Sequence, residues 1–377
     1  MRIGVPNETR GERRVAITPQ VALRLIERRH QVVIESGAGL GAAISDDDYR
    51  SAGVEVSADP FRDADVVLMV GPPGRDQVER VPEGAVLIGF LDPFSAADVV
   101  RSLTERRVTS FAMEAIPRTT LAQGMDALSS QATAAGYAAV LIAATATPRF
   151  FPMFTTAAGT IAPVKLLVLG AGVAGLQAIA TAKRLGAVVS AYDIRPEVRE
   201  QIESLGARFV SAPVDESAAA ASGYAKEVAD ETQRRQIEAL APYVAASDVL
   251  ITTAQIPGAP APLLVSREMV EQMRPGSVIV DVAAPTGGNV ELTRPGETVE
   301  HNGVTIIAPT DLPSRLAVDA SQMYARNVTS LLARMADEEG NLSLDFEDQI
   351  IAEACITHEG RVVHPVVRRS LGLESEK

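Results

Sequence analysis

A glycine-rich segment at residues 170–175 has the residue types and spacing of a dinucleotide-binding turn. It reads Gly-Ala-Gly-Val-Ala-Gly, and it follows an apolar run at 165–169 and opens a helical pattern. In such a turn the first glycine permits the sharp bend, the second lets the backbone approach a pyrophosphate, and the third lets the helix pack closely on the strand. Because a strand and a helix are predicted on its two sides, we expect Gly170, Gly172 and Gly175 to form a phosphate-binding turn.

An acidic residue stands at the distance from this turn that a dinucleotide site requires. Asp193 ends the apolar run 187–193, 23 positions after Gly170. A carboxylate there accepts hydrogen bonds from the adenosine ribose hydroxyls and repels a 2′-phosphate, so the pattern predicts a preference for NAD(H) over NADP(H). Arg195 could in principle pair with a 2′-phosphate, but next to Asp193 we expect it to pack on the adenine or to neutralise the carboxylate.

A second glycine-rich turn, at residues 37–42, fits the looser pattern G-x-G-x-x-A. Three aspartates at 46–48 follow it at the start of a predicted helix. Negative charge at a helix start would repel a pyrophosphate, so we expect no nucleotide there.

Groups for acid–base or nucleophilic chemistry are sparse. The four histidines, His30, His301, His358 and His364, all lie away from the glycine turn, so we expect structural roles for them. The single cysteine, Cys355, cannot form an internal disulfide or a multi-thiolate metal site. No metal-ligand spacing, nucleophile elbow or P-loop is present, and we predict no metal site.

A polar segment at residues 118–131 precedes and enters an alanine-rich helix at the predicted junction of two domains, where a ligand cleft is expected. The guanidinium of Arg118, the amide of Gln123 and the hydroxyl of Ser129 suit a polar, uncharged group such as a carboxamide. The alternative interpretation is a helix-capping region with Asp126 at the helix start. That alternative leaves the other polar side chains unexplained.

Short apolar runs alternate with amphipathic segments along the chain, which is typical of parallel sheets covered by helices on both faces. The expected strands are 2–6, 31–36, 66–71, 85–90 and 108–113, then 165–170, 187–193, 207–211, 248–254, 277–283 and 305–309. The predicted fold class is therefore α/β, with two Rossmann-like doubly wound parallel-sheet domains joined by long helices.

We expect the first domain to span residues 1–126 plus 311–377 and the NAD(H)-binding domain to span 127–310. Helices at 127–148 and 314–335 should join them, with an irregular segment at 148–163. Residues 127–148 carry no charge, but they are mostly Ala, Ser and Thr, so we interpret them as a helix packed on protein rather than a membrane span.

Composition restricts the partners and the compartment. The 377 residues include 35 basic and 48 acidic side chains, a net charge of −13, which disfavours nucleic acid and anionic lipid as ligands. The N-terminus is too charged for a signal peptide. These features indicate a cytoplasmic protein with no direct membrane insertion.

Several segments resemble the NAD(H)-binding subunit, domain I, of proton-translocating NAD(P) transhydrogenase. They are residues 116–140 (IPRTTLAQGMDALSSQATAAGYAAV), 169–195 (LGAGVAGLQAIATAKRLGAVVSAYDIR), 222–228 (SGYAKEV) and 273–289 (MRPGSVIVDVAAPTGGN). The likeness extends from the opening MRIGVPNETRGERRVAITP to EGRVVHP near the C-terminus, and so covers essentially the whole chain.

The resemblance implies roles for individual residues. Arg118, Gln123 and Asp126 would be the catalytic residues of a loop that holds the nicotinamide ring, with Gln123 orienting it toward NADP(H) on a partner. Ala171, Gly172 and Val173 would contact the pyrophosphate, and Asp193, Ile194 and Arg195 the adenosine. Gly223 and Tyr224 match a mobile loop that closes over the nucleotide, and the remaining nucleotide contacts would be Leu128, Ser129, Gln236 and Gln255.

Alanine dehydrogenase is the related alternative, and it binds its keto acid with an arginine, a lysine and a histidine. Arg14 matches the arginine, but the lysine falls near Met69 or Gly71 and the histidine at Asp92. A pyruvate carbonyl would lack its cation and its proton donor, so the sequence disfavours amino-acid oxidation.

Hydride transfer between two nicotinamide rings needs no proton at the reacting carbons, which fits the scarcity of acids and bases. The resemblance implies a homodimer that receives NADH and passes hydride to NADP(+) on a domain III (beta) subunit, while a membrane domain II couples the reaction to proton translocation. We expect these domains to be other polypeptides that hold the chain at the cytoplasmic face of the inner membrane. A non-catalytic NAD-binding scaffold is the alternative from another class.

Overall fold

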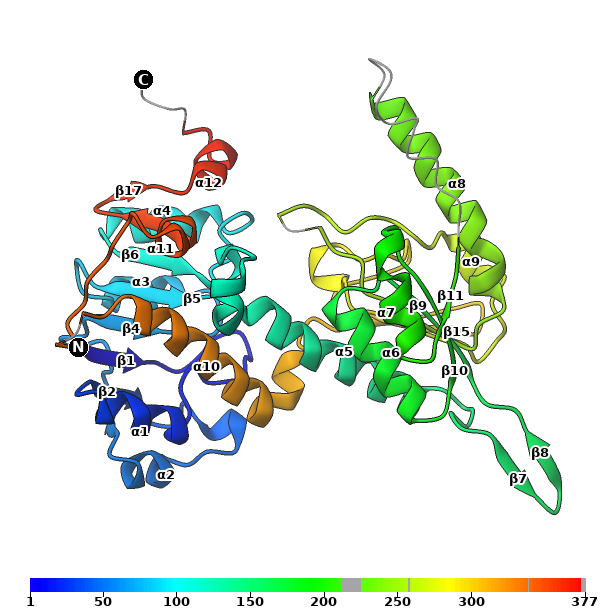
Figure 1. Cartoon of the computed structure of the whole chain (residues 1–377), viewed down its shortest axis with the longest axis horizontal. Helices are drawn as coiled ribbons and strands as arrows, with labels where there is room; N and C mark the ends of the chain where they lie inside the picture. The colour runs from blue at the N-terminus through cyan, green and yellow to red at the C-terminus, as the bar shows by residue number, and fades with distance from the viewer. Residues whose placement is uncertain (212–224, 257, 338, 374–377) are drawn as a thin grey trace. The chain divides into compact units, whose positions relative to one another are not determined.

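The computed structural model describes residues 1–211, 225–256, 258–337 and 339–373, without the side chains of 225–234 (Figure 1). The chain divides into two compact units. Unit 1 comprises Met1–Gln131 and Pro313–Lys377, and unit 2 comprises Ala132–Leu312. The sequence-based boundaries were placed after residues 126 and 310.

Unit 1 contains an eight-stranded sheet with the order β17-β16-β6-β5-β4-β1-β2-β3. Its six parallel strands are β1 (Arg2–Val5), β2 (Gln31–Glu35), β3 (Glu55–Ser57), β4 (Val66–Leu68), β5 (Val86–Gly89) and β6 (Thr109–Ala112). The strands β16 (Cys355–His358) and β17 (Arg361–Val362) extend the sheet in antiparallel fashion beside β6. The C-terminal segment thereby completes a sheet that the N-terminal segment begins.

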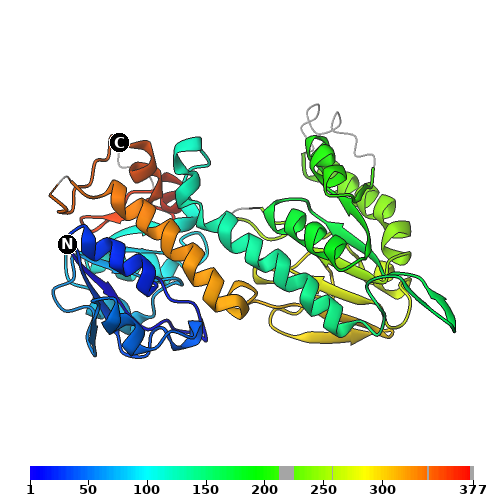
Figure 2. The same ribbon diagram turned by 60° about the horizontal axis from the view of Figure 1, so that its bottom comes forward.

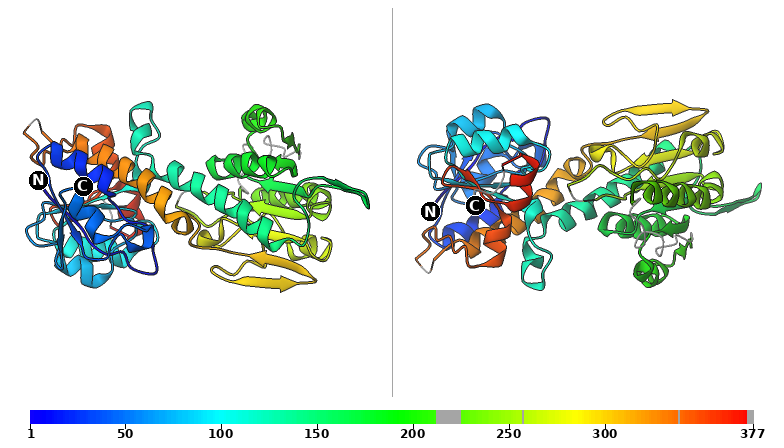
Figure 3. Two further views of the ribbon diagram at one scale, coloured as in Figure 1. Left: turned by 90° about the horizontal axis from the view of Figure 1, so that it is seen from below. Right: turned by 90° about the horizontal axis from the view of Figure 1, so that it is seen from above.

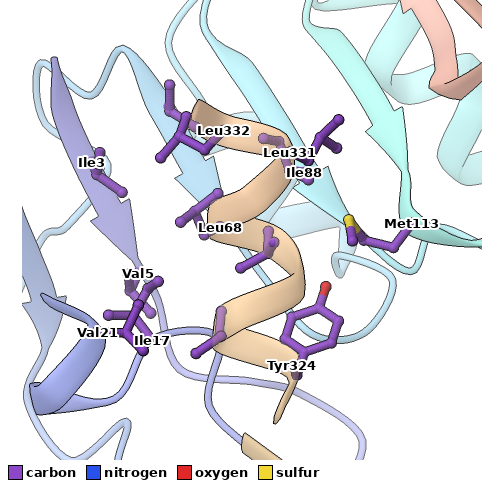
Figure 4. Packing of buried hydrophobic residues seen from close by; sticks show 14 of the residues in the cluster. Ile3, Val5, Ile17, Val21, Leu68, Ile88, Met113, Tyr324, Leu331 and Leu332 are labelled. Atoms are coloured by element: carbon purple, nitrogen blue, oxygen red, sulfur yellow. The ribbon is translucent and has the colours of Figure 1, made fainter. Parts of the chain in front are cut away.

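Helices cover this sheet, and the longest in unit 1 is α10 (Ala317–Arg334). The others are α1 (Pro19–Glu27), α2 (Asp46–Ser51), α3 (Arg75–Arg80), α4 (Ala97–Glu105), α11 (Gln349–Ala354) and α12 (Pro365–Ser370). Figure 4 shows Tyr324, Leu331 and Leu332 of α10 in one apolar cluster with Leu68 of β4 and Ile88 of β5. The Tyr324 hydroxyl donates to the carbonyl of Met69 at 2.6 Å, which fixes the helix to the end of β4.

Unit 2 contains a seven-stranded sheet with the order β11-β10-β9-β12-β13-β15-β14. The strands are β9 (Lys165–Leu169), β10 (Val188–Tyr192), β11 (Arg208–Phe209), β12 (Val249–Thr252), β13 (Val278–Asp281), β14 (Thr298–His301) and β15 (Val304–Ile307). Its helices are α6 (Val173–Arg184), α7 (Arg199–Ser204), α8 (Ala225–Ala245) and α9 (Arg267–Glu271). The order of the first five strands is that of a doubly wound nucleotide-binding sheet, and the predicted fold class is confirmed.

One strand of unit 2 was absent from the sequence-based prediction. β14 pairs antiparallel with β15 at the sheet edge, through a turn at Asn302 and Gly303, whose φ angles are +50° and +76°. Positive φ at both turn residues is the geometry of a tight two-residue hairpin, for which Asn-Gly is the preferred sequence.

The helix α5 (Ala127–Ala146) begins in unit 1 and continues into unit 2. Among the described residues it is the one helix long and apolar enough to cross a membrane by length and composition, and half of its most apolar window is buried within the protein. Within unit 2 it lies beside α6, because a Cβ atom at Gly136 would stand 2.1 Å from the carbonyl oxygen of Ala174 (Figure 2). Ala138, Ala139 and Ala143 are also buried.

The segment after α5 is not irregular, as the sequence had suggested, but forms a hairpin of β7 (Phe154–Thr156) and β8 (Gly159–Ile161). The hairpin extends away from the sheet of unit 2 in each view (Figure 3). Its strands have three residues each and no buried side chain, so they lack the apolar periodicity by which buried strands are predicted.

Candidate functional site

The glycine turn of unit 2 has the geometry that its sequence predicts. Gly170 follows β9 with φ of +98°, a backbone conformation that side chains disfavour. A Cβ atom at Gly175 would lie 1.9 Å from the Gly170 carbonyl oxygen, so only glycine lets α6 pack this closely. At Gly172 a Cβ atom would meet nothing within 4 Å, which leaves the backbone open to a ligand.

The start of α6 is suited to an anion. Gly172 is the N-cap residue and supplies no side-chain hydrogen bond to the first amides of the helix. Those amides carry the positive end of the helix dipole, which favours a pyrophosphate. The turn therefore fits the phosphate groups of a dinucleotide.

The turn lies where the strand order of the sheet reverses. β9 pairs with β10 on one side and β12 on the other, and ligands of doubly wound sheets bind at that crevice. The loop after β12 meets the turn directly, because the Thr253 hydroxyl donates to the Gly170 carbonyl at 3.0 Å. Two loops from adjacent strands thus form one edge of the candidate site.

Asp193 follows β10 at the same edge and is almost fully buried, but its carboxylate already has partners. It accepts hydrogen bonds from the backbone amides of Ala171 at 2.7 Å and Arg195 at 2.9 Å. The Arg195 guanidinium donates to both of its oxygens, at 3.0 and 3.1 Å. Burial tends to raise the pKa of Asp193, but these hydrogen bonds outweigh burial and hold it below its ordinary value. Arg195 neutralises Asp193, one of its two expected arrangements.

A buried polar network that the sequence reasoning missed supports the neighbouring loops. Asn289 donates to the carbonyls of Ala254 and Pro262, both at 2.8 Å, and accepts from the Ala254 amide at 3.0 Å. Asp281 at the end of β13 accepts from the Asn289 amide at 2.8 Å and from the Thr252 hydroxyl at 2.8 Å. Asp281 and Asn289 have no exposed area. Through Asn289 the network joins the backbone at Ala254 to that at Pro262, so it fixes these two positions after β12.

Four of the remaining predicted contacts lie among the described residues of unit 2. Gln255, in the loop that Asn289 closes, is exposed and donates to the Val282 carbonyl at 3.4 Å. Gln236 on α8 donates to the hydroxyl of Tyr192 at 3.1 Å. Val173 and Ile194 are exposed, as surface ligand contacts would be. Gly223 and Tyr224 lie outside the described residues.

The polar loop 118–129 belongs to unit 1, where the short 3₁₀ helix Thr120–Met125 carries it. Ala122 and Met125 are buried beneath it, and the Asn327 side chain donates to the Gly124 carbonyl at 2.9 Å. These contacts anchor the loop to α10 while Arg118, Gln123 and Leu128 stay exposed. An anchored backbone with exposed polar side chains is a suitable ligand-binding loop.

Asp126 acts as a helix cap within this loop. Its carboxylate accepts from the Ser129 amide at 2.8 Å and from the Ser129 hydroxyl at 2.6 Å, at the start of α5. The capping interpretation of Asp126 therefore also accounts for Ser129, which the sequence reasoning left unexplained. Arg118 and Gln123 are not part of the cap.

The carboxyl edge of the unit 1 sheet holds two half-buried acids that the sequence reasoning also missed. Glu8 accepts from the amides of Val70 and Gly71 at 2.6 and 3.0 Å. Glu114 accepts with one oxygen from the amides of Leu91 and Asp92, at 2.9 and 2.6 Å. Burial raises the pKa of each carboxyl to about 7 despite these hydrogen bonds. Each acid joins the ends of neighbouring strands.

The positions that matched a keto-acid site differ here from the expected pattern. Arg14 forms hydrogen bonds with both carboxylate oxygens of Glu12, at 2.9 and 2.6 Å, and with Gln131 at 2.7 Å. Met69 is fully buried, and the Gly71 amide is already bonded to Glu8. The arginine is committed to its neighbours, and neither a lysine nor a histidine stands at the other two positions.

Three histidines have partners in the fold. His358 contacts the Thr109 hydroxyl at 3.1 Å, His301 contacts Glu271 at 2.8 Å, and His364 caps α12. His30 is buried at the end of α1. Among the described residues, no group of three or more His, Cys, Asp or Glu side chains is arranged to hold a metal ion.

The doubly wound sheets and the glycine turn at the strand-order reversal define an oxidoreductase-type dinucleotide-binding protein with two Rossmann-like units. The chain belongs to the alanine dehydrogenase/PNT family: the N-terminal domain model of that family matches residues 4–135 and the C-terminal domain model matches 139–365. The second match runs beyond unit 2, because α10 and β16 follow unit 2 in sequence but pack in unit 1.

The relatives of this chain come from two branches of the family, the transhydrogenases and the alanine dehydrogenases. The chain is 46% identical to the first part of NAD(P) transhydrogenase subunit alpha from Rhodospirillum rubrum, over 97% of this chain and 99% of that protein. It is 31% identical to alanine dehydrogenase of Bacillus subtilis, over 99% of this chain and 96% of that protein. A transhydrogenase structure from Sinorhizobium meliloti matches with a TM-score of 0.88 at 43% identity, covering 96% and 99% of the two chains. The resemblance to transhydrogenase is confirmed, and NAD(H) is the cofactor type of this family.

Proposed function

We propose that this chain is the NAD(H)-binding subunit of a proton-translocating transhydrogenase. It passes hydride from NADH to NADP(+) held by a partner domain III subunit, and a membrane domain II couples the transfer to proton translocation. One contrast between the two units carries the proposal. Unit 2 has a glycine turn that is open to a nucleotide. The keto-acid positions of unit 1 lack the lysine and the histidine, and their arginine, Arg14, is hydrogen-bonded to Glu12 and Gln131.

In this proposal the residues of unit 2 bind the nucleotide. Gly170, Ala171, Gly172 and Val173 hold the pyrophosphate at the start of α6, while Gly175 lets that helix approach. Asp193, Ile194 and Arg195 contact the adenosine. The Asp193 carboxylate, which is paired with Arg195, accepts hydrogen bonds from the ribose hydroxyls. Gln236, Gln255, Gly223 and Tyr224 complete the contacts.

The loop of unit 1 holds the nicotinamide. Arg118 and Gln123, both exposed on an anchored backbone, contact the ring end of the cofactor, and Gln123 orients the ring toward NADP(H). Asp126 and Ser129 set the start of α5 and thereby the shape of the loop, and Leu128 adds an apolar contact. Because hydride moves directly between two C4 atoms, this site has only to hold the rings in contact and exclude water.

The assembly includes a homodimer of this chain, a membrane domain II subunit and an NADP(H)-binding domain III subunit. We place the chain at the cytoplasmic face of the inner membrane, held there by its partners. Its charge of −13 disfavours direct binding to anionic lipid, which supports attachment through other subunits.

The deciding experiment mixes the purified chain with a domain III subunit and follows reduction of an NADP(+) analogue by NADH. Transfer that depends on both proteins supports the proposal, whereas NADH binding without transfer would identify a non-catalytic scaffold. Pyruvate and ammonia with NADH should give no oxidation, and rapid turnover would establish alanine dehydrogenase instead.

The variant Gln123→Asn tests the role of the loop. It should slow hydride transfer with little change in NADH affinity, because the shorter side chain misplaces the ring while the nucleotide contacts of unit 2 remain. A loss of NADH affinity with an unchanged transfer rate would contradict the role given to Gln123.

A further inference from the structure

The side chain of Arg14 is held from two sides within unit 1. Its guanidinium donates to both carboxylate oxygens of Glu12, at 2.9 and 2.6 Å, and its Nη1 donates to the side-chain oxygen of Gln131 at 2.7 Å. Burial tends to raise the pKa of Glu12, but the hydrogen bonds from Arg14 outweigh burial and hold it below its ordinary value. The charged pair fixes the guanidinium, which presents one of its donors to Gln131.

Gln131 begins a row of side-chain hydrogen bonds that ends at the polar loop 118–129, which we call the nicotinamide loop. Its Nε2 donates to the Ser130 hydroxyl at 3.1 Å. That hydroxyl donates to Oδ1 of Asn327 at 2.7 Å, and Nδ2 of Asn327 donates to the Gly124 carbonyl at 2.9 Å. We call the four side chains of Arg14, Gln131, Ser130 and Asn327 the relay.

The relay has a fixed direction, because a guanidinium can only donate hydrogen bonds. Gln131 therefore turns its amide oxygen to Arg14 and its nitrogen to Ser130. The Ser130 hydroxyl accepts that bond and directs its own hydrogen to the oxygen of Asn327, which leaves the Asn327 nitrogen for Gly124. A carbonyl can only accept, so the group that reaches Gly124 is the donor it requires. The cation at one end thus sets the amide orientation at the other.

Most of the relay is shielded from water. Gln131 is 5% exposed, Asn327 is 8% exposed and the side chain of Arg14 is 11% exposed. Hydrogen bonds in such surroundings are stronger than in water, and a buried donor or acceptor left without its partner is costly. Gly124 itself is exposed. The relay therefore connects the interior of unit 1 to the exposed backbone of the nicotinamide loop.

The position of Gly124 matters because of its neighbour in the sequence. Gln123 precedes it directly, and in the proposed function Gln123 orients the nicotinamide ring. A movement of the Gly124 carbonyl would therefore move Gln123 as well. A misplacement of reacting groups by about 1 Å can reduce a rate about a hundredfold, even when the altered residue lies away from the chemistry.

We propose that Arg14 and Asn327 are positioning residues for hydride transfer. Through the relay, Arg14 orients the amide of Asn327, which holds the Gly124 carbonyl and thereby Gln123. The inference rests on the proposed function and deepens it, because it names side chains behind the nicotinamide loop that set the position of the ring. The arginine at the keto-acid position of the alanine dehydrogenase pattern serves this loop instead of a substrate.

The test compares two amide-to-acid variants on α10. Asn327→Asp keeps the acceptor for Ser130 but places an oxygen where the donor to Gly124 stood. Reduction of an NADP(+) analogue by NADH in the presence of a domain III subunit should slow at least about tenfold, whereas NADH affinity by titration calorimetry should stay that of the wild type. Gln322→Glu makes the same change at a position that is hydrogen-bonded to Thr18 and Gln20. It is the matched control and should transfer hydride as the wild type does.

A second pair of variants interrupts the relay at another residue. Ser130→Ala removes the hydroxyl and should slow transfer as Asn327→Asp does, and Ser130→Thr keeps the hydroxyl and should retain the wild-type rate. This pair carries the test should Asn327→Asp misfold, which urea unfolding detects. The double variant Arg14→Met/Asn327→Asp should transfer no more slowly than the slower of its two single variants, because both changes interrupt one row of bonds.

Amide hydrogen exchange gives a readout that does not depend on hydride transfer. Exchange at residues 120–125 should accelerate in Asn327→Asp and stay unchanged in Gln322→Glu. Unchanged exchange and transfer in Asn327→Asp and Ser130→Ala overturn the proposal, as do losses that multiply in the double variant or a loss of NADH affinity as large as the loss of rate. A wild-type chain that transfers no hydride contradicts the proposed function, and faster exchange in the loop of the variants would still support the relay.

Discussion

Arg195 holds Asp193 through its backbone amide and its guanidinium, at 2.9 Å from the amide and at 3.0 and 3.1 Å from Nε and Nη2. The arginine is therefore occupied by the carboxylate that we expect to repel a 2′-phosphate. A cation that would suit NADPH lies two residues from an acid that would suit NADH, and we expect their pairing to favour NADH.

Replacing Asp193 by serine should shift the cofactor preference toward NADPH. The change removes the repulsive carboxylate and releases the Arg195 guanidinium, while the serine hydroxyl can still accept the Ala171 amide. The ratio of NADPH to NADH affinity should rise at least about tenfold, equivalent to about 1.4 kcal/mol. Titration calorimetry with both cofactors measures it, and Arg195→Ala in the same background should cancel the gain. An unchanged ratio would show that Asp193 does not set the preference.

Substitutions at two glycines of the turn should have different effects: one should weaken nucleotide binding, and the other should lower stability. Gly172→Ala adds a methyl group that meets no protein atom among the described residues, at a φ of −72° that alanine adopts readily, so stability should stay within about 0.5 kcal/mol. NADH affinity should fall, because the methyl group occupies the space where the backbone approaches the pyrophosphate. Calorimetry and urea unfolding provide the two readouts.

Gly175→Ala should show the opposite pattern. Its methyl group would lie 1.9 Å from the Gly170 carbonyl oxygen, which forces α6 away from β9. We expect the stability of unit 2 to fall by about 2 kcal/mol or more, within the range of overpacked core positions. Equal stability of the two glycine variants would contradict this division of roles.

Asn289 should affect NADH binding through the loop that it closes. Asn289→Ala removes three hydrogen bonds, to Ala254 and Pro262, and deprives these half-buried backbone groups of them, at a cost of about 1–3 kcal/mol. Hydrogen exchange should accelerate in residues 254–262 rather than uniformly, and NADH affinity should fall with it. Gln272→Ala, at an exposed position after α9, is the control. Uniform acceleration across unit 2 would indicate general destabilisation instead.

Glu114 should make unit 1 less stable as the pH rises. Its carboxyl has an ordinary pKa of 4.5 and a pKa of about 7 in the fold, because burial disfavours the charge. Between these values the unfolded chain has lost the proton that the folded chain retains. The contribution of Glu114 to stability is therefore largest below pH 4.5, falls as the pH rises to about 7 and stays low above it.

Glu114→Gln should remove this loss of stability, because glutamine carries no charge. Its amide oxygen can still accept the hydrogen bonds from the Leu91 and Asp92 amides. Its amide nitrogen takes the place of the carboxylate oxygen that has no hydrogen-bond partner among the described residues. The variant should be more stable than wild type at pH 8, by an amount on the order of 1–3 kcal/mol, and similar near pH 4.5. Urea unfolding at the two pH values measures the difference. Glu27→Gln on the exposed face of α1 is the control, and a gain that does not depend on pH would contradict the assignment.

Most of the parallel strands were predictable, because burial on both faces leaves a sequence signature. The edge strand β3 was missed, because none of its three residues is fully buried. The runs 165–169 and 278–280 are apolar almost without interruption, as strands inside a doubly wound sheet must be. The glycine turn was predictable for a different reason, since each of its glycines is required by a local backbone geometry.

Features that depend on distant residues could not be predicted in this way. Asn289 reaches Ala254, 35 positions earlier in the chain, and no spacing rule links the two. Glu8 and Glu114 are joined to neighbouring strands only once the sheet has formed. Asp281 did carry a signal, because an acid that ends an apolar strand needs partners, and Asn302-Gly303 was a visible hairpin signal.

The order of synthesis has a consequence for unit 1. The helix α10 forms the centre of its apolar cluster and β16 completes its sheet, yet both follow the whole of unit 2 in the chain. During translation, unit 2 leaves the ribosome with all its strands while unit 1 still lacks the helix that covers its core. The nucleotide-binding unit can therefore fold first. The sheet of unit 1, with six of its eight strands made, is completed only when the last third of the residues of that unit has been synthesised.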